Sequence, residues 1–278
     1  MSRGILHCGR YRLSLERALI MGVVNVTPDS FSDGGRYLDA EKAASHARRL
    51  IEEGADLLDI GGESSRPGAE AVSAEEELRR VVPVLRRLQD VAVPVAIDTV
   101  KPEVMRAAIE EGAAMINDIN ALGAPGALEI VAASDAAVCL MHMRGEPRTM
   151  QANTEYGDVV AEVMRFLGGR ADAARAAGIA RERIVVDPGF GFGKKPEHNL
   201  ELLRALRSIG ELGYPVLAGL SRKSTLGALT GKPVSERVAA SVAAALLAVQ
   251  HGARIVRVHD VAATRDALAI LAAVQGST

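Results

Sequence analysis

The sequence predicts an α/β protein, a single (β/α)8 TIM barrel with its active site at the C-terminal ends of the strands. Eight short apolar runs are spaced along the 278 residues, and helical segments fall between them. The runs are continuously apolar, which is typical of strands buried on both faces of a parallel sheet. Eight β-then-α units in one uninterrupted chain favour a closed barrel over an open, doubly wound sheet. Neither glycine motif that would support the open sheet is present, Gly-x-Gly-x-x-Gly after the first strand or a Walker A loop.

The expected strands are joined to the helices before them by a recurring fragment. The strands are expected at residues 18–26, 57–61, 93–98, 115–119, 136–142, 183–187, 215–220 and 254–259. Three of them follow a Gly-Ala pair, at Gly54, Gly112 and Gly252. We interpret each glycine as the end of a helix, because a left-handed residue there costs glycine no Cβ clash.

Helix signals lie between these strands. Asp39 is expected to cap the first helix, because its side chain can accept a bond from an unpaired backbone N–H. Pro102 suits the first turn of a helix that ends at Gly112. Pro83 is expected to kink or split the helical pattern of residues 73–90, since it lacks a backbone donor.

Composition excludes several classes of protein. The net charge of −2 argues against a nucleic acid or an anionic membrane surface as the main partner. With 48% hydrophobic and 24% charged residues, the chain can bury a sizeable core. The longest nearly apolar run, residues 238–249, is too short to span a bilayer, and residues 1–20 hold no stretch that suits a secretory signal, so we expect a cytoplasmic protein. Cys8 and Cys139 are too few for a disulfide framework, and no linker divides residues 1–278, so we expect one domain.

Almost every expected strand finishes in a polar or ionisable side chain. In a barrel these positions gather at one end, where such a ring would be costly to bury without ligand partners. For Asp59 and Asp118, capping the next helix is an equally good interpretation. The ring comprises Asn25, Asp59, Asp98, Asn117, Asp118, His142, Asp187, Ser221, Lys223, Arg257 and His259.

The ring divides by chemistry. Arg66, Arg257 and His259, with Asn25 and Ser65 nearby, suit a multiply charged anion, because arginine matches phosphate oxygens bidentately. The amide oxygen of Asn25 suits Mg²⁺, which keeps several waters and shares the phosphates with few protein ligands. A structural hydrogen bond is the alternative for His259.

The remaining groups suit a flat heterocyclic ring and a second ring or carboxylate beside it. Asp98, Asn117 and Asp187 supply acceptors and an amide for a nitrogen-rich heterocycle. Lys223 suits stacking over a ring or binding a carboxylate, and His142 is expected to be structural.

Two loops are rich in glycine and polar residues, 27–35 and 61–68. They are either solvated turns or lids over the site, and we favour lids because each carries side chains with a binding use, among them Phe31, Asp33 and Arg66.

These motifs together resemble those of the dihydropteroate synthases. The first signature is similar to residues 21–35 (MGVVNVTPDSFSDGG), and the second to residues 59–68 (DIGGESSRPG). Further matches occur in family order at residues 98–99, 117–119, 141–143, 187–194, 221–224 and 257–260. The resemblance covers nearly the whole chain.

The resemblance implies a transferase of folate biosynthesis, often a homodimer and a sulfonamide target. Such an enzyme condenses 6-hydroxymethyl-7,8-dihydropterin diphosphate with 4-aminobenzoate and releases pyrophosphate, in an SN1-like reaction assisted by Mg²⁺. By resemblance, the pterin would be held by Asp98, Asn117, Asp187 and Lys223 with Met141 packing in its pocket, and the diphosphate by Asn25, Ser65, Arg66, Arg257 and His259. Asn25 would ligate Mg²⁺, and the aminobenzoate would be bordered by Phe31, Ser65, Pro67, Phe192, Lys223 and Ser224. Asp33, Arg66, Asp98 and Lys223 would carry the catalytic roles, Asp33 from the closed first loop.

The chain departs from the family pattern at Ser65, where threonine is usual. Serine keeps the hydroxyl and loses a methyl group, so the expected change falls on the edge of the aminobenzoate pocket and on sulfonamide fit.

Three other functions are weighed. A pterin-binding methyltransferase barrel, which uses methyltetrahydrofolate and a corrinoid partner, gives no reason for the cluster of Arg66, Arg257 and His259. A non-catalytic barrel that binds a pterin or a protein would be favoured by loss of Asp33, Arg66, Lys223 or His259, and all four are present. A Schiff-base aldolase needs a desolvated lysine, which the adjacent Arg222 and Lys223 do not indicate.

Overall fold

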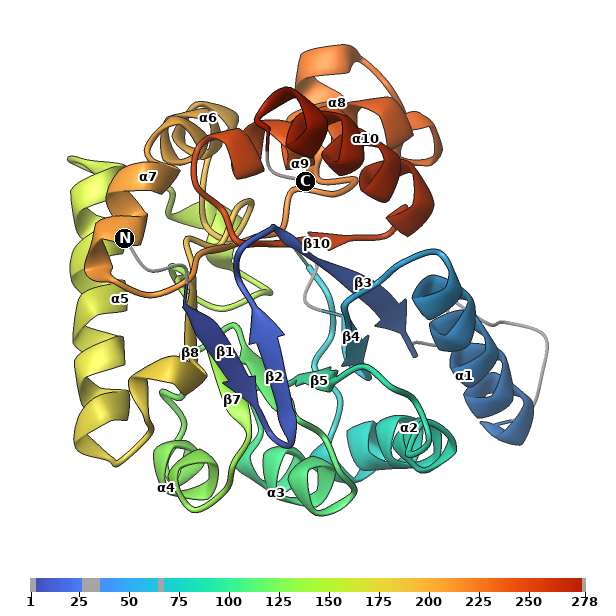
Figure 1. Cartoon of the computed structure of the whole chain (residues 1–278). Coiled ribbons are helices and arrows are strands. Elements are labelled where there is room, and N and C mark those ends of the chain that lie inside the picture. The colour runs from blue at the N-terminus through green and yellow to red at the C-terminus, as the bar shows by residue number, and fades with distance from the viewer. Residues whose placement is uncertain (1–3, 27–35, 65–67, 277–278) are drawn as a thin grey trace.

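A computed structural model describes residues 4–26, 36–64 and 68–276, with side chains for all of these except residues 36–38. Within these ranges, eight parallel strands form a nearly closed barrel surrounded by helices (Figure 1). The strands are β3 (Leu19–Asn25), β4 (Leu57–Gly61), β5 (Val95–Asp98), β6 (Met115–Asp118), β7 (Ala137–Met141), β8 (Ile184–Asp187), β9 (Leu217–Ala218) and β10 (Ile255–Val258). All eight expected strands are confirmed, each within a few residues of its predicted ends.

Neighbouring strands pair in the order β8-β7-β6-β5-β4-β3-β10-β9. The remaining seam, between β8 and β9, is closed just before β9: the amide of Val186 donates to the Pro215 carbonyl at 3.0 Å, and Val186 and Val216 form a parallel bridge. The sheet therefore closes on itself, as the count of eight strands predicts.

The helices lie outside the strands, where an apolar layer of strand and helix residues joins them to the sheet. They are α1 (Arg36–Glu52), α2 (Ala74–Arg87), α3 (Pro102–Glu110), α4 (Ala127–Ala132), α5 (Val159–Ala176), α6 (Pro196–Arg204), α7 (Leu206–Ile209), α8 (Ser224–Thr230), α9 (Val238–Gln250) and α10 (Val261–Val274). Short 3-10 turns cover η2 (Met150–Ala152), η3 (Arg181–Arg183), η4 (Gly210–Leu212) and η5 (Val234–Glu236). None of the helices in the described ranges is long and apolar enough to cross a membrane.

The glycine stops are confirmed, because Gly54, Gly112 and Gly252 have φ of 105°, 96° and 111°. Pro102 opens α3, also as expected. The prediction that Asp39 caps the first helix is wrong, because Asp39 lies in the first turn of α1. Pro83 does not split the helical pattern either, since α2 continues through it. The carbonyl of Pro83 accepts a bond from Arg87 at 2.9 Å, so the end of this helix is held by a side chain.

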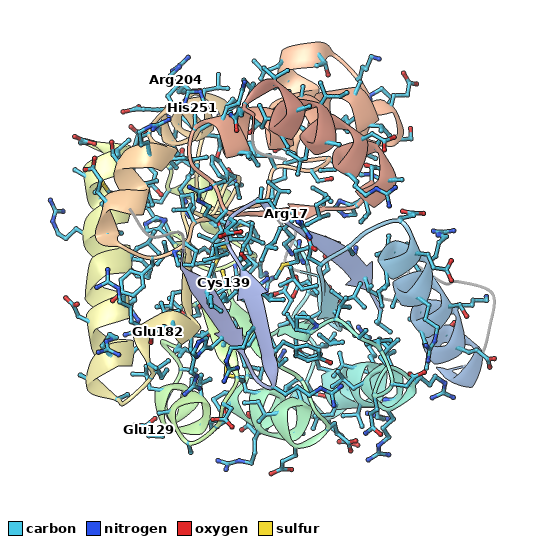
Figure 2. The ribbon with its side chains drawn as sticks, viewed as in Figure 1. Arg17, Glu129, Cys139, Glu182, Arg204 and His251 are labelled. Carbon is cyan, nitrogen blue, oxygen red and sulfur yellow. The ribbon has the colours of Figure 1, made fainter. Side chains whose placement is uncertain are left out.

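A hairpin that the sequence did not predict covers the N-terminal end of the barrel. It is formed by β1 (Ile5–Cys8) and β2 (Tyr11–Ser14), which cross the near end of the barrel in Figure 1. Leu6 and Cys8 pack against a buried layer inside the barrel, to which every barrel strand contributes a residue. Cys139 of β7 belongs to this layer and lies at the middle of the ring, whereas Glu129 and Glu182 lie at the periphery (Figure 2). With this end filled by apolar side chains, the opposite end carries the polar groups.

Candidate functional site

The polar residues of the site are placed by strand periodicity. The buried layer includes Leu57, Ala96, Met115, Cys139, Val185, Leu217 and Ile255, one from each strand from β4 to β10. Side chains alternate between the two faces of a strand, so the residue two positions further along each strand also points inward. Those residues are Asp59, Asp98, Asn117, Met141, Asp187, Gly219 and Arg257. The next inward-facing layer along the barrel axis is therefore mostly polar, whereas the layer before it is apolar.

Asp59 connects the two sides of this polar layer. Its Oδ2 atom accepts hydrogen bonds from Nε of Arg257 at 2.5 Å and from Nδ2 of Asn117 at 3.0 Å. Arg257 also donates from a terminal guanidinium nitrogen to Oδ2 of Asp98 at 3.0 Å. Asp59 is fully buried, so the charge of Arg257 is needed to offset the cost of removing this carboxylate from water.

Two acceptors in the layer have no hydrogen-bond partner among the described residues. They are Oδ1 of Asp59 and Oδ1 of Asn117, both buried. Because the amide nitrogen of Asn117 is engaged by Asp59, its oxygen remains as an acceptor. An unsatisfied buried acceptor costs about 1–3 kcal/mol, so these atoms fit a ligand that brings N–H donors.

Lys223 lies on the other side of the site, against the loop that follows β8. Its ammonium donates to the carbonyl of Phe190 and lies 4.6 Å from the ring centroid of Phe192. In the same loop the amide of Gly189 donates to Oδ1 of Asp187 at 2.7 Å. Gly219 lies between the two long cations, since a Cβ there would be in van der Waals contact with both Arg257 and Lys223.

Burial shifts the titration of the central groups. Burial and the nearby charge of Asp59 raise the pKa of Asp98 to about 7, although Arg257 opposes the shift. Burial also raises the pKa of Asp187, against the charge of Lys223. Burial lowers the pKa of Lys223 to about 8, with Asp187 opposing it. The sequence-based expectation that Lys223 lacks desolvation is therefore wrong, and the site holds a carboxyl and an amine that both titrate near neutral pH.

Asn25 and His259 line a cavity of about 1020 Å³ between α1 and the α8–α10 side of the barrel. Ser221 holds His259 by two contacts, accepting from its backbone amide at 3.2 Å and lying 3.0 Å from Nδ1. Arg222 turns to Asp260 at 2.6 Å, away from Lys223. The contact with Ser221 fixes the position of the His259 ring at the edge of this cavity.

Two strand-end residues are structural. Asp118 accepts bonds from the amides of Asn120 at 2.7 Å and Leu122 at 2.8 Å, so it stabilises the turn after β6 and does not cap the next helix, α4, whose N-cap is Gly126. His142 contacts the buried ammonium of Lys194 at 2.9 Å, which confirms the structural role expected for it.

The structure thus gathers most of the predicted site residues at one end of the barrel. Met141 pairs with Asp187 across β7 and β8, and Ser224 is exposed at the start of α8. The sequence placed Asp59 in the ring of strand-end residues but gave it no role in binding or catalysis. Phe31, Asp33, Ser65, Arg66 and Pro67 lie outside the described residues. Across the described ranges, no group of three or more His, Cys, Asp or Glu side chains is arranged to hold a metal ion.

The barrel carries a ring of carboxylates, an amide and cations at its strand ends. These features define an enzyme of the class that binds a small polar heterocycle at this end of the barrel. The sequence model of the pterin binding enzyme family matches residues 21–259. The dihydropteroate synthase of Neisseria meningitidis serogroup B is 52% identical over 277 residues, with 97% of each chain covered. The chain therefore belongs to the pterin binding enzymes and, among them, to the dihydropteroate synthases, which are transferases of folate biosynthesis.

Solved structures agree with this assignment. Xanthomonas albilineans dihydropteroate synthase with 4-aminobenzoic acid superposes with a TM-score of 0.93 at 57% identity, covering 99% of both chains. Burkholderia cenocepacia dihydropteroate synthase complexed with 7,8-dihydropteroate has a TM-score of 0.90 at 53% identity, covering 99% of this chain and 97% of the other. These similarities favour the synthase over the methyltransferase and aldolase alternatives.

Proposed function

We propose that the strand-end site condenses 6-hydroxymethyl-7,8-dihydropterin diphosphate with 4-aminobenzoate, giving 7,8-dihydropteroate and pyrophosphate. The observation that carries this proposal is the pair of buried, unpartnered acceptors on Asp59 and Asn117, beside the carboxyl of Asp98. A dihydropterin presents ring N–H and amino groups along one edge, which are the donors these oxygens lack. An analogue without the donors would leave them unpaired, and this gives the pocket its specificity.

The pterin ring would lie against Asp98, Asn117, Asp187 and Lys223, with Met141 packing beside it. Asp98 and Asn117 are directly paired on β5 and β6, so their side chains leave the sheet at one level. Met141 is 4% exposed, and its thioether offers the ring an adaptable apolar contact. This arrangement supports binding of a flat ring by polar edges and an apolar face.

The diphosphate would be held by Asn25, Arg257 and His259, together with Ser65 and Arg66. The guanidinium of Arg257 already bridges two carboxylates, so it brings a fixed positive charge to the centre of the barrel. Asn25 offers one neutral oxygen, a donor set that fits Mg²⁺ because this ion takes most of its ligands from water and phosphate. When bound there, Mg²⁺ would neutralise charge on the departing pyrophosphate.

The reaction is a substitution at the pterin methylene carbon. Its bond to the diphosphate oxygen breaks, and the electron pair leaves with pyrophosphate. The aniline nitrogen then forms the new C–N bond and loses one proton. Positive charge left on the pterin methylene group would be stabilised by the carboxylates of Asp98 and Asp59, the kind of fixed electrostatic effect that is usually largest in catalysis.

The aminobenzoate would lie at the outer side, bordered by Phe192, Lys223 and Ser224, with Phe31, Ser65 and Pro67 from the other loops. The ring of Phe192 beneath the Lys223 ammonium supports this placement, because it offers an aromatic surface beside a positive charge for the carboxylate. Asp33 and Arg66 would complete the catalytic set, and sulfonamides would compete for the same place.

We further propose a cytoplasmic homodimer, formed by one domain spanning residues 1–278. The thirteen residues of α9 include no charged side chain, and Leu247 on this helix is 43% exposed. On neighbouring α10, Ile270 and Val274 are 68% and 80% exposed and lie one turn apart on the same side of the helix. Exposed apolar side chains on one side of α10 support packing against a second copy. Two buried free cysteines, Cys8 and Cys139, are consistent with a reducing compartment.

The test of the proposed reaction is pyrophosphate release from the pterin diphosphate with Mg²⁺, measured with and without 4-aminobenzoate. We expect release to require all three components and to fall at least a hundredfold in Asp98→Asn, a magnitude typical of a lost transition-state contact. Asp56→Asn is the matched control, because Asp56 pairs with Arg17 and the Ile20 amide at the other end of the barrel. Pterin binding by calorimetry without turnover in the unmodified protein would contradict the proposed reaction.

A further inference from the structure

Lys194 is a buried lysine with no part in the proposed reaction. It directly follows the Gly-Phe-Gly-Phe-Gly segment at residues 189–193 and is 3% exposed. Its Nζ atom lies 2.9 Å from Nδ1 of His142, 2.9 Å from the Gly189 carbonyl, 3.0 Å from the Phe192 carbonyl and 3.3 Å from the His142 carbonyl. All four acceptors are neutral, so the ammonium is stabilised by hydrogen bonds rather than by a direct carboxylate contact.

The protonation of both partners follows from their burial. Burial, together with the charge of Lys194, lowers the pKa of His142 to about 3, so the imidazole is neutral. Burial lowers the pKa of Lys194 to about 7, with Asp187 opposing the shift. A neutral imidazole accepts the lysine hydrogen at Nδ1 and carries its own hydrogen at Nε2. Lys194 is therefore the donor, and its three N–H groups serve four acceptors, of which the His142 carbonyl at 3.3 Å is the most distant.

These contacts join the loops that follow β7 and β8. The two loops approach backbone to backbone: a Cβ on Gly189 would lie 1.9 Å from the His142 carbonyl oxygen, and one on Gly193 2.7 Å from that of Arg144. Both glycines have positive φ, 69° and 64°. Nζ of Lys194 bonds both loops where they approach, at the His142 carbonyl on one side and the Gly189 and Phe192 carbonyls on the other.

The peptide units that Lys194 holds are those that carry the outer half of the site. The Gly189 unit contacts Asp187, the Phe190 carbonyl accepts from Lys223, and the Phe192 ring lies beneath the Lys223 ammonium. Lys194 bonds the carbonyls on both sides of this stretch, at Gly189 and Phe192. A shift of either carbonyl would move the Phe192 ring and the acceptor of Lys223 together.

We propose that Lys194 is a positioning residue for the aminobenzoate side of the site, an inference that rests on the proposed function. It holds Phe192 and Lys223 where the second substrate binds, whereas Asn117 and Arg257 are held independently by Asp59, and Asp98 by Arg257. Loss of the ammonium therefore weakens binding of aminobenzoate and of sulfonamides much more than binding of the pterin.

The experiment compares Lys194→Met with Lys195→Met. Methionine keeps the apolar stem and removes the donors. The neighbouring Lys195 is the matched control, because its side chain is 40% exposed and pairs with Glu155 in solvent. The measurements are kcat, KM for each substrate, and the Kd of the pterin diphosphate by calorimetry. For Lys194→Met we expect KM for aminobenzoate to rise roughly tenfold or more, the effect of about one lost buried hydrogen-bonding group. The pterin shares Asp187 and Lys223 with this loop but keeps Asp98 and Asn117 on the other side of the site, so its Kd should rise several-fold less than KM for aminobenzoate.

A second variant guards against misfolding. Lys194→Gln keeps two N–H donors, so it should fold. Its KM for aminobenzoate should also rise more than its Kd for the pterin, but by a smaller factor than in Lys194→Met. Equal rises in both KM values, or no change in either, would show that Lys194 only stabilises the fold and would overturn the proposal. Absence of turnover in the unmodified protein would instead count against the proposed reaction, and the two failures are therefore distinguished.

Discussion

Asp59 and Arg257 lie 198 residues apart in the sequence and form a hydrogen-bonded ion pair of 2.5 Å inside the barrel. The pair joins β4 to β10, which are separated in the sheet by β3. Through the same oxygen Asp59 also fixes the amide of Asn117. One buried carboxylate therefore sets both the position of a cation and the direction in which a neutral amide presents its oxygen.

We expect Asp59→Asn to lower kcat/KM for the pterin diphosphate by at least about a hundredfold. The amide oxygen can still accept from Arg257 and Asn117, but the NH2 group then takes the place of the unpartnered Oδ1, and the negative charge beside Arg257 is lost. The change should appear in the affinity for the pterin, measured by calorimetry, as well as in turnover. The double variant Asp59→Asn/Asn117→Asp restores one carboxylate to the pair, so partial recovery is expected. A double variant no better than the single one would contradict this account of Asp59.

Asp98 should make stability depend on pH. Burial and the charge of Asp59 raise its pKa to about 7, against Arg257, whereas an unfolded aspartate titrates near about 4. Between these values the folded protein binds a proton that the unfolded chain has lost, so this group's contribution to stability falls as the pH rises from about 4 to 7. Asp98→Asn removes the titration.

The free energy of unfolding of Asp98→Asn relative to the unmodified protein should therefore increase from pH 5 to pH 8, by on the order of 3 kcal/mol. Urea denaturation at four pH values measures the difference, and contributions of other groups cancel in it. Parallel profiles for the two proteins would show that Asp98 ionises normally in the folded state.

The barrel was predictable because its signals are local. Each strand is a short apolar run, and Gly54, Gly112 and Gly252 mark the helix ends by a backbone conformation that glycine adopts without cost. The ring of polar strand ends was predictable for the same reason, since parallel strands place their ends together. The hairpin of β1 and β2 was not, because each strand has four residues and only Leu6 and Cys8 of β1 are buried.

The partners within the ring could not be predicted. Asp59 has equal reason to cap a helix or to enter the site until its contacts with Asn117 and Arg257, 58 and 198 residues away, are known. Lys194 lies in the segment of residues 187–194 that resembles the dihydropteroate synthases. Its burial depends on the approach of the loop after β7, which no local pattern encodes. The desolvation of Lys223 could not be predicted for the same reason, because the residues that bury it, such as Phe190 in the loop after β8, come from other parts of the sequence.

Lys223 should limit activity at high pH. Burial lowers its pKa to about 8, with Asp187 opposing, so the ammonium that contacts Phe190 and Phe192 is lost above that pH. We expect kcat/KM for aminobenzoate to fall above about pH 8 in the unmodified protein. In Lys223→Arg, which stays charged, activity should be lower but the fall should move beyond pH 9. An unmoved fall would assign the titration to another group.

Gly189 should not tolerate a side chain. Its φ is 69°, and a Cβ would lie 1.9 Å from the His142 carbonyl oxygen, so Gly189→Ala must separate the two loops. We expect a loss of roughly 3 kcal/mol or more in the free energy of unfolding. Gly169→Ala is the matched control, because Gly169 lies within α5 with no atom within 4 Å of the added Cβ. That change should stabilise the protein by about 0.5–1 kcal/mol, and equal losses in both variants would contradict the steric account.

The exposed apolar side chains of Ile270 and Val274 on α10 predict how the chain associates. A charge there would have to be desolvated for a second copy to pack against α10, so we expect the double variant Ile270→Glu/Val274→Glu to sediment as a monomer of 29.3 kDa and the unmodified protein at twice that mass. Ile5→Glu is the control, since Ile5 is 52% exposed on the hairpin at the end of the barrel away from the site. A dimer in both variants would place the interface elsewhere, and a monomer in the unmodified protein would remove the proposed assembly altogether.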